Sequence, residues 1–218
     1  MTKFFFLAAA AVLSFAATAN AQLLFDEATG VEGSGDPLNP TALGIFSGGV
    51  FEVSGSSVLG PDGAGAGTLT DTTRDLFGFT IASGFQLDSI EVTELTQTLN
   101  VNGDLDPGFF FLDSGTTTAI PGGGFTPITG ALIGVGPLAS GGVGADLLSL
   151  DNITVTPGPA AGPQGAGDFV FGIQQTGPEE LSYTIAFNVS AVAVPEPSSM
   201  ALLSLAAFGL TGMRRRRK

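Results

Sequence analysis

Residues 181–190, Leu-Ser-Tyr-Thr-Ile-Ala-Phe-Asn-Val-Ser, decide the fold class of this chain. Large apolar residues alternate with small or polar ones, so every second side chain lies on the same face of an extended strand. Such a strand covers a core with one face and meets solvent with the other. The stretch therefore predicts a half-buried β-strand whose core face carries Leu181, Tyr183, Ile185, Phe187 and Val189.

The same period of two recurs upstream. It is clear at Phe169, Phe171 and Ile173, and again at Phe77, Phe79 and Ile81. Three further strands are expected over residues 87–101, 109–112 and 147–155, and clusters of Gly, Pro, Asn and Asp separate the candidates. Many short strands joined by turns predict an all-β fold, which we expect to be a jelly-roll-like β-sandwich with Gly-rich loops.

The composition supports a β fold and excludes most enzyme classes. The 218 residues include 33 Gly, 13 Pro and 18 Phe, but no Cys, His or Trp. Without Cys or His there is no thiol nucleophile, no Ser-His-Asp triad and no usual zinc site. Only carboxylates, hydroxyls and the single Tyr remain for catalysis. We expect a protein that is not an enzyme and that has no cofactor.

A carboxylate-based hydrolase is the enzymatic alternative. Glu91 and Glu94 could form the carboxylate pair that glycoside hydrolysis requires. They are three positions apart in a predicted strand, so they are expected on opposite faces of the sheet. This prediction argues against the hydrolase.

Charge is segregated along the chain. All 20 acidic residues except Glu196 lie between Gln22 and Val194, where Arg74 is the one basic residue. Phosphate binding needs Lys and Arg, so nucleic acid is not expected as a partner. A strongly acidic surface favours solubility and attracts cations.

The N-terminal end has the three parts of a signal peptide. Lys3 gives a short positive region, an apolar run follows it, and Ala19-Asn20-Ala21 reads as an A-x-A cleavage site. Residues 1–21 are therefore expected to form a signal helix that is removed on export, with Gln22 as the new N-terminus.

The C-terminal end also has three parts in a fixed order. Val194, Pro195, Glu196 and Pro197 open a segment, 194–199, whose prolines disfavour a helix. Residues 200–213 are uncharged and mostly apolar, and form a short candidate transmembrane helix. Five positive charges end the chain, and these are expected to stay in the cytoplasm: Arg214, Arg215, Arg216, Arg217 and Lys218.

This tail resembles the PEP-CTERM sorting signal of Gram-negative bacteria that produce exopolysaccharide, also known as the ice-binding-protein C-terminal domain. The resemblance covers residues 194–218 and rests on the V-P-E-P core, the helix and the arginine cluster. It implies that an exosortase recognises the motif. It also implies an exported precursor, anchored in the inner membrane through residues 200–213, that later reaches the cell surface or extracellular matrix.

Within the interior domain, residues 22–193, the stretch from Leu76 to Ile185 is similar to the bacterial pre-peptidase C-terminal domain, a jelly-roll-like sandwich. The likeness rests on the D-x-F-x-F strand at Asp168, the central strand that ends in Asp113, and the Y-x-I strand at Tyr183. Domains of this kind are suspected of binding polysaccharide or matrix, so exopolysaccharide is a candidate partner.

One short segment has the residue types of a calcium site. Asn102, Asp104 and Asp106 place hard oxygen ligands at alternate positions in a turn. The segment departs from an EF-hand, since it lacks the Gly at the sixth position and the closing Glu. Calcium and an ordinary acidic turn both stay open.

Two functions follow as expectations. The first is a structural or adhesive envelope protein, sorted through its C-terminal tail. The second is an extracellular carbohydrate-binding module, supported by calcium. The second is weakened because sugar sites often use aromatic platforms, and the chain has no Trp and only Tyr183.

Overall fold

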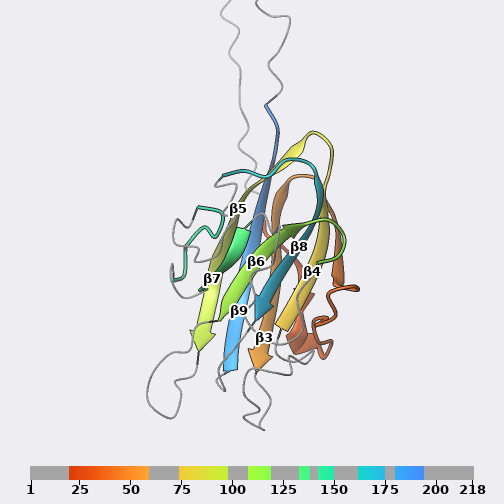
Figure 1. The fold of residues 1–218 in the computed structure, drawn as a ribbon. Coiled ribbons are helices and arrows are strands. Elements are labelled where there is room, and N and C mark those ends of the chain that lie inside the picture. Colours follow the sequence, from red (N-terminus) through yellow and green to blue (C-terminus); the bar gives the residue numbers. More distant parts are fainter. Residues whose placement is uncertain are drawn as a thin grey trace, which may run out of the picture.

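The computed structural model describes residues 20–58, 74–97, 108–118, 133–137, 142–149, 162–174 and 180–193. These residues form two β-sheets that stack as the layers of a sandwich (Figure 1). The four-stranded sheet has the order β1-β3-β9-β5, and the five-stranded sheet has the order β2-β4-β8-β6-β7. The strands are β1 (Gln22–Asp26), β2 (Thr41–Phe46), β3 (Gly49–Val58), β4 (Arg74–Ile81), β5 (Phe85–Gln97), β6 (Phe109–Ser114), β7 (Ile133–Pro137), β8 (Gly167–Gln174) and β9 (Glu180–Ala191).

The most regular sequence patterns form the middle of each sheet. β9 pairs antiparallel with both β3 and β5, and β8 pairs antiparallel with both β4 and β6. The N-terminal strands β1 and β2 are added at one end of each sheet and pair in parallel with β3 and β4. A short 3-10 helix, η1 (Glu27–Thr29), follows β1.

Phenylalanine side chains fill the space between the sheets. Phe46 of β2 stacks on Phe51 of β3 at 4.3 Å between ring centroids, and so joins the two layers. Phe187 of β9 lies 5.1 Å from Phe79 of β4 and meets Phe171 of β8 edge-on at 5.4 Å. Edge-on and stacked rings at these distances add to the stabilisation from apolar burial.

A second buried apolar row lies on the outer face of the five-stranded sheet. Leu76, Phe111 and Val170 are at most 5% exposed, yet they do not belong to the cluster between the sheets. Gly172 lies among them, and a Cβ added there would overlap the Phe111 ring. The glycine therefore lets a ring lie flat against the sheet.

The strand predictions are largely confirmed. Residues 181–190, 169–173, 77–81 and 109–112 form strands, and all five predicted core residues of residues 181–190 are buried. The sandwich class is confirmed as well. The expected jelly-roll-like arrangement stays a prediction, and the two flanking helices fall outside the described residues.

Two parts of the strand prediction are wrong. Residues 146–149 form a bridge and a turn against β5 rather than a strand, because Leu147 N–H donates to Ile90 O and the chain then turns away. The sequence also gave no prediction of β1, β2, β3 and β7. Together these supply one edge of the four-stranded sheet, both edges of the five-stranded sheet and the second neighbour of β9.

Candidate ligand-binding site

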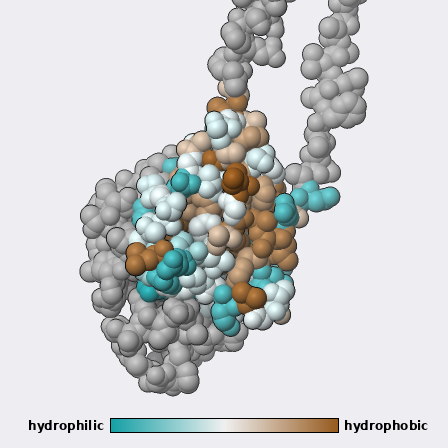
Figure 2. All heavy atoms as spheres, turned by 90° about the vertical axis from the view of Figure 1, so that its right-hand side faces the viewer, coloured by the Kyte–Doolittle hydropathy of each residue, from teal (hydrophilic) through white to brown (hydrophobic). Residues whose placement is uncertain are grey.

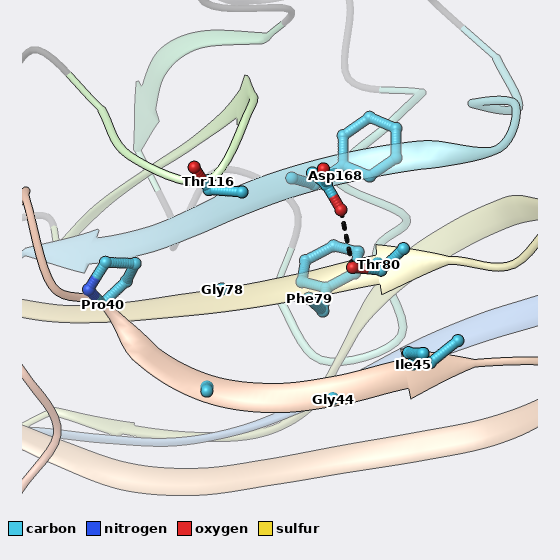
Figure 3. A pocket seen from close by; sticks show the side chains of 10 residues that line it. Pro40, Gly44, Ile45, Gly78, Phe79, Thr80, Thr116 and Asp168 are labelled. Atoms are coloured by element: carbon cyan, nitrogen blue, oxygen red, sulfur yellow. Dashed lines mark hydrogen bonds between the residues drawn. The ribbon is translucent and has the colours of Figure 1, made fainter.

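A hollow of about 260 Å³ opens on the outer face of the five-stranded sheet (Figure 3). β2, β4 and β8 form its floor, and Thr116 contributes from the loop after β6. The hollow is lined by Pro40, Ala42, Gly44, Ile45, Gly78, Phe79, Thr80, Thr116, Asp168 and Phe169.

The hollow exists because small residues from distant parts of the chain come into register. Ala42 pairs with Gly78, which in turn pairs with Val170 across β4 and β8. The register of β2 shifts between Ala42 and Gly44, where the backbone is left-handed with a φ of 92°. Ala42, Gly44 and Gly78 therefore have little or no side chain to cover this part of the sheet.

A polar pair lies at one end of the hollow. Ile45, Thr80 and Asp168 form the next row across the strands. Thr80 Oγ1 donates a hydrogen bond of 2.6 Å to Asp168 Oδ1, as Figure 3 shows. Asp168 is exposed, so its carboxylate can accept further hydrogen bonds from solvent or from a ligand.

Two loops form the walls. Pro40 ends the 34–40 loop, and its Cγ lies 3.2 Å from where a Cβ on Gly78 would be. Asp36 stabilises this loop by accepting bonds from Leu38 N–H at 2.9 Å and from Asn39 Nδ2 at 2.7 Å. The Asn39 amide, followed by the Leu38 N–H, holds the pKa of Asp36 below its ordinary value. Thr118 N–H donates to Pro37 O and joins this loop to the one that carries Thr116.

The outer face of the four-stranded sheet has a hollow of different character. Its volume is about 330 Å³, and it is lined by Leu23, Asp26, Glu52, Ser54, Thr93, Glu94 and Thr184. Thr184 Oγ1 donates to Glu94 Oε2 at 3.2 Å. This hollow therefore repeats the threonine–carboxylate pair, but among several acidic residues.

The predicted orientation of the glutamate pair is wrong. Glu91 pairs with Ala186, and Glu94 with Thr184, two residues away on β9. The register of β5 shifts between Val92 and Glu94, so the extra residue brings both glutamates to the outer face. The argument from strand period against a carboxylate pair therefore fails.

A buried polar cluster links the two sheets elsewhere. Asp75 of β4 is 3% exposed and accepts a hydrogen bond of 2.6 Å from the Tyr183 hydroxyl on β9. Burial raises the pKa of Asp75 to about 8; the Tyr183 bond lowers it, while neighbouring Glu27 and Glu32 raise it. Burial, followed by the charge of Asp75, raises the pKa of Tyr183 well above its ordinary value.

Glu27 connects this cluster to the N-terminal segment. Its carboxylate accepts hydrogen bonds from Gly33 N–H at 2.9 Å and from Ser56 N–H at 2.5 Å. Gly33 and Gly55 leave no room for side chains, because a Cβ at Gly33 would meet Asp75 and one at Gly55 would meet Tyr183. The cluster is closed by protein groups, so we regard it as structural.

Most of the site residues predicted from the sequence lie outside the described residues. These are Ala19 of the signal cleavage site, the calcium candidates Asn102, Asp104 and Asp106, the sorting residues Val194, Pro195, Glu196 and Pro197, and the basic residues Arg214, Arg215, Arg216, Arg217 and Lys218. Ala21 is exposed, and Gln22 begins β1. The first strand thus starts at the predicted mature N-terminus.

Among the residues that the structure describes, no three acidic side chains converge in a way that could hold a metal ion. No helix among those residues has the length and apolar character needed to span a bilayer.

Fold and site together define a two-layer β-sandwich with a solvent-open hollow on each outer face. Residues 193–217 match the family model of the PEP-CTERM protein-sorting motif. The motif supports exosortase-dependent sorting of an exported protein, as the sequence predicted. No curated protein and no solved structure matches the chain.

Proposed function

We propose that the chain is a non-enzymatic structural or adhesive protein of the cell envelope, displayed outside the cell after exosortase processing. The observation that carries this proposal is the sorting motif at residues 193–217. The acidic composition of the sandwich domain also suits a surface that stays soluble outside the cell.

The position of the motif supports processing without damage to the fold. β9 ends at Ala191, two residues before the motif begins. β9 lies between β3 and β5 in the middle of its sheet, and ends at the top of the sandwich in Figure 1. Cutting near Pro195-Glu196-Pro197 would therefore remove no described strand.

Intact mass spectrometry on protein from its native cells tests the sorting step. A species that begins at Gln22 and ends near Pro195-Glu196-Pro197 is expected. Replacing these three residues with alanine should leave the chain uncut, whereas three alanines at Ser198-Ser199-Met200 serve as the matched control. Normal processing of the first variant would overturn the exosortase assignment.

A carbohydrate-binding module is the second candidate. The hollow on the five-stranded sheet favours it, because Pro40 and Ile45 line that hollow beside the Thr80 hydroxyl and the Asp168 carboxylate. Calcium support at Asn102, Asp104 and Asp106 remains part of this proposal.

A further inference from the structure

We propose that the hollow on the outer face of the five-stranded sheet binds one neutral sugar ring of a polysaccharide, with Thr80 and Asp168 as its polar contacts. The inference rests on the carbohydrate-binding candidate above and gives it a site, a ligand class and contact residues. It does not depend on how the tail is processed.

The size of the hollow limits the ligand to about one ring. Sites for drug-sized molecules span about 300–1,000 Å³, and this one has about 260 Å³. It is open to solvent, so a longer chain can continue past a ring that is bound there. A single residue within a polymer fits these limits better than a large free ligand.

The walls suit the C–H face of a sugar ring. Pro40 and Ile45 offer apolar surface on either side of the glycine row, and Ile45 is 70% exposed. Phe79 and Phe169 also line the hollow, but their rings belong to the core between the sheets, where Phe79 lies 5.1 Å from Phe187 of β9, so the apolar contact with a ligand comes from Pro40 and Ile45. Figure 2 views the side of the sandwich that faces right in Figure 1, and there brown apolar groups reach the surface among pale and teal polar ones.

The polar end suits hydroxyl donors. An ionised Asp carboxylate can only accept hydrogen bonds, and the Thr80 hydroxyl already donates its one hydrogen bond to Asp168. The pair therefore offers acceptor positions to a ligand that donates. Sugar hydroxyls donate hydrogen bonds, and bonds to a charged acceptor are stronger than those between neutral groups.

Charge decides between neutral and ionic ligands. An anionic sugar would approach a domain that has one basic residue, Arg74, between its two ends. A cationic ligand would be attracted more strongly to the opposite hollow, where Asp26, Glu52 and Glu94 are lining residues. We therefore expect the hollow that has one carboxylate, Asp168, to bind a neutral sugar ring.

The test is a pull-down of the full-length chain, kept in mild detergent, on insoluble cellulose, β-1,3-glucan and mannan. The double variant Thr80→Val and Asp168→Asn should weaken binding to the preferred glycan by about tenfold or more, because two contacts with the hydroxyls are lost. The matched control is Thr184→Val with Glu94→Gln, which removes the equivalent pair from the opposite sheet and should leave binding unchanged.

A second variant tests the hollow without altering its polar groups. Ala42→Leu places a larger side chain in the floor from an exposed position on β2, and it should abolish binding while the melting temperature changes little. This variant keeps the proposal testable should the double variant fail to fold.

Several outcomes would overturn the inference. These are no binding to any of the three neutral glycans, equal losses in the two double variants, or stronger binding to the anionic polymer alginate. Binding to an unrelated protein rather than to glycan would assign the hollow to a protein partner. Mass spectrometry of the same variants separates the two proposals, since normal tail processing without glycan binding rejects only the sugar site.

Discussion

The two outer faces of the sandwich carry the same pair of groups in different surroundings. Thr80 donates to Asp168 at 2.6 Å beside a row of small residues, whereas Thr184 donates to Glu94 at 3.2 Å among other carboxylates. Where a sheet row ends in glycine and alanine, neighbouring loops and rings can approach the backbone. Where the row carries long acidic chains, as Glu52 and Glu91 do on either side of Ala186, those side chains cover the sheet.

The largest expected effect tests how tightly each face is covered. Gly172→Val should destabilise the fold by about 3 kcal/mol or prevent folding, because the new side chain would overlap Phe111 and Leu76. Ala186→Val is the matched change at the outer face of β9. Ala186 is also buried, at 3% exposed, but its neighbours Glu52 and Glu91 have flexible side chains that can move into solvent, so the change should cost less than about 1 kcal/mol. Urea unfolding of both variants provides the measurement.

Equal losses of stability would break the comparison. They would mean that the acidic face is packed as closely as the apolar one. A small loss at Gly172 would mean that Phe111 can move away from the sheet at little cost.

The second prediction concerns the bond that joins the two sheets. With its pKa raised to about 8, Asp75 keeps its proton in the folded protein, whereas an unfolded Asp releases it near pH 3.9. Between these values the native state binds more protons, so its stability falls as pH rises, by at most about 1.4 kcal/mol per pH unit. The wild-type protein should therefore melt at a lower temperature at pH 8 than at pH 5.

Asp75→Asn isolates this effect from the other acidic residues. Asparagine has no charge at either pH and keeps an oxygen that can accept the Tyr183 hydrogen bond. The difference in melting temperature between pH 5 and pH 8 should shrink in this variant. If it stays as large as in the wild type, general repulsion among the carboxylates explains the pH dependence instead.

The sequence predicted the central strands β8 and β9 well, but it missed strands whose apolar pattern is short or interrupted. β9 alternates without a break, and the core-face residues of β8 keep the same period, although Val170 on its outer face is also apolar and buried. β3 has only Phe51 and Val53 before Gly55 and Ser57 occupy the core face, and β2 is interrupted by the irregularity at Gly44. The weak pair Phe51 and Val53 was the one signal that could have revealed β3.

The candidate hollow could not be predicted, because it depends on the register between distant segments. In the sequence, nothing distinguishes Gly78 from other glycines in strands. Only the structure shows that Pro40 and Ala42 lie beside it. Likewise, the shift after Val92 that brings Glu91 and Glu94 to one face leaves no mark in the strand period. Local alternation specifies which face is buried, whereas bulges and parallel pairing are decided by the whole sheet.

The smallest effect concerns charge on the acidic face. Glu52→Gln with Glu94→Gln should raise stability at low ionic strength by at most about 0.5 kcal/mol, because these like charges on β3 and β5 repel across β9 and groups near the surface are well screened. The gain should vanish in 1 M salt, where the Debye length is about 3 Å. Asp168→Asn on the other face should give no gain at either ionic strength, since it removes the charge from the Thr80 bond without relieving a crowded set of carboxylates. Asp168→Asn could instead give a gain of the same size. That result would mean that the repulsion depends on the net charge of the domain and not on how the charge is distributed between the faces. The two outer faces would then differ only in shape.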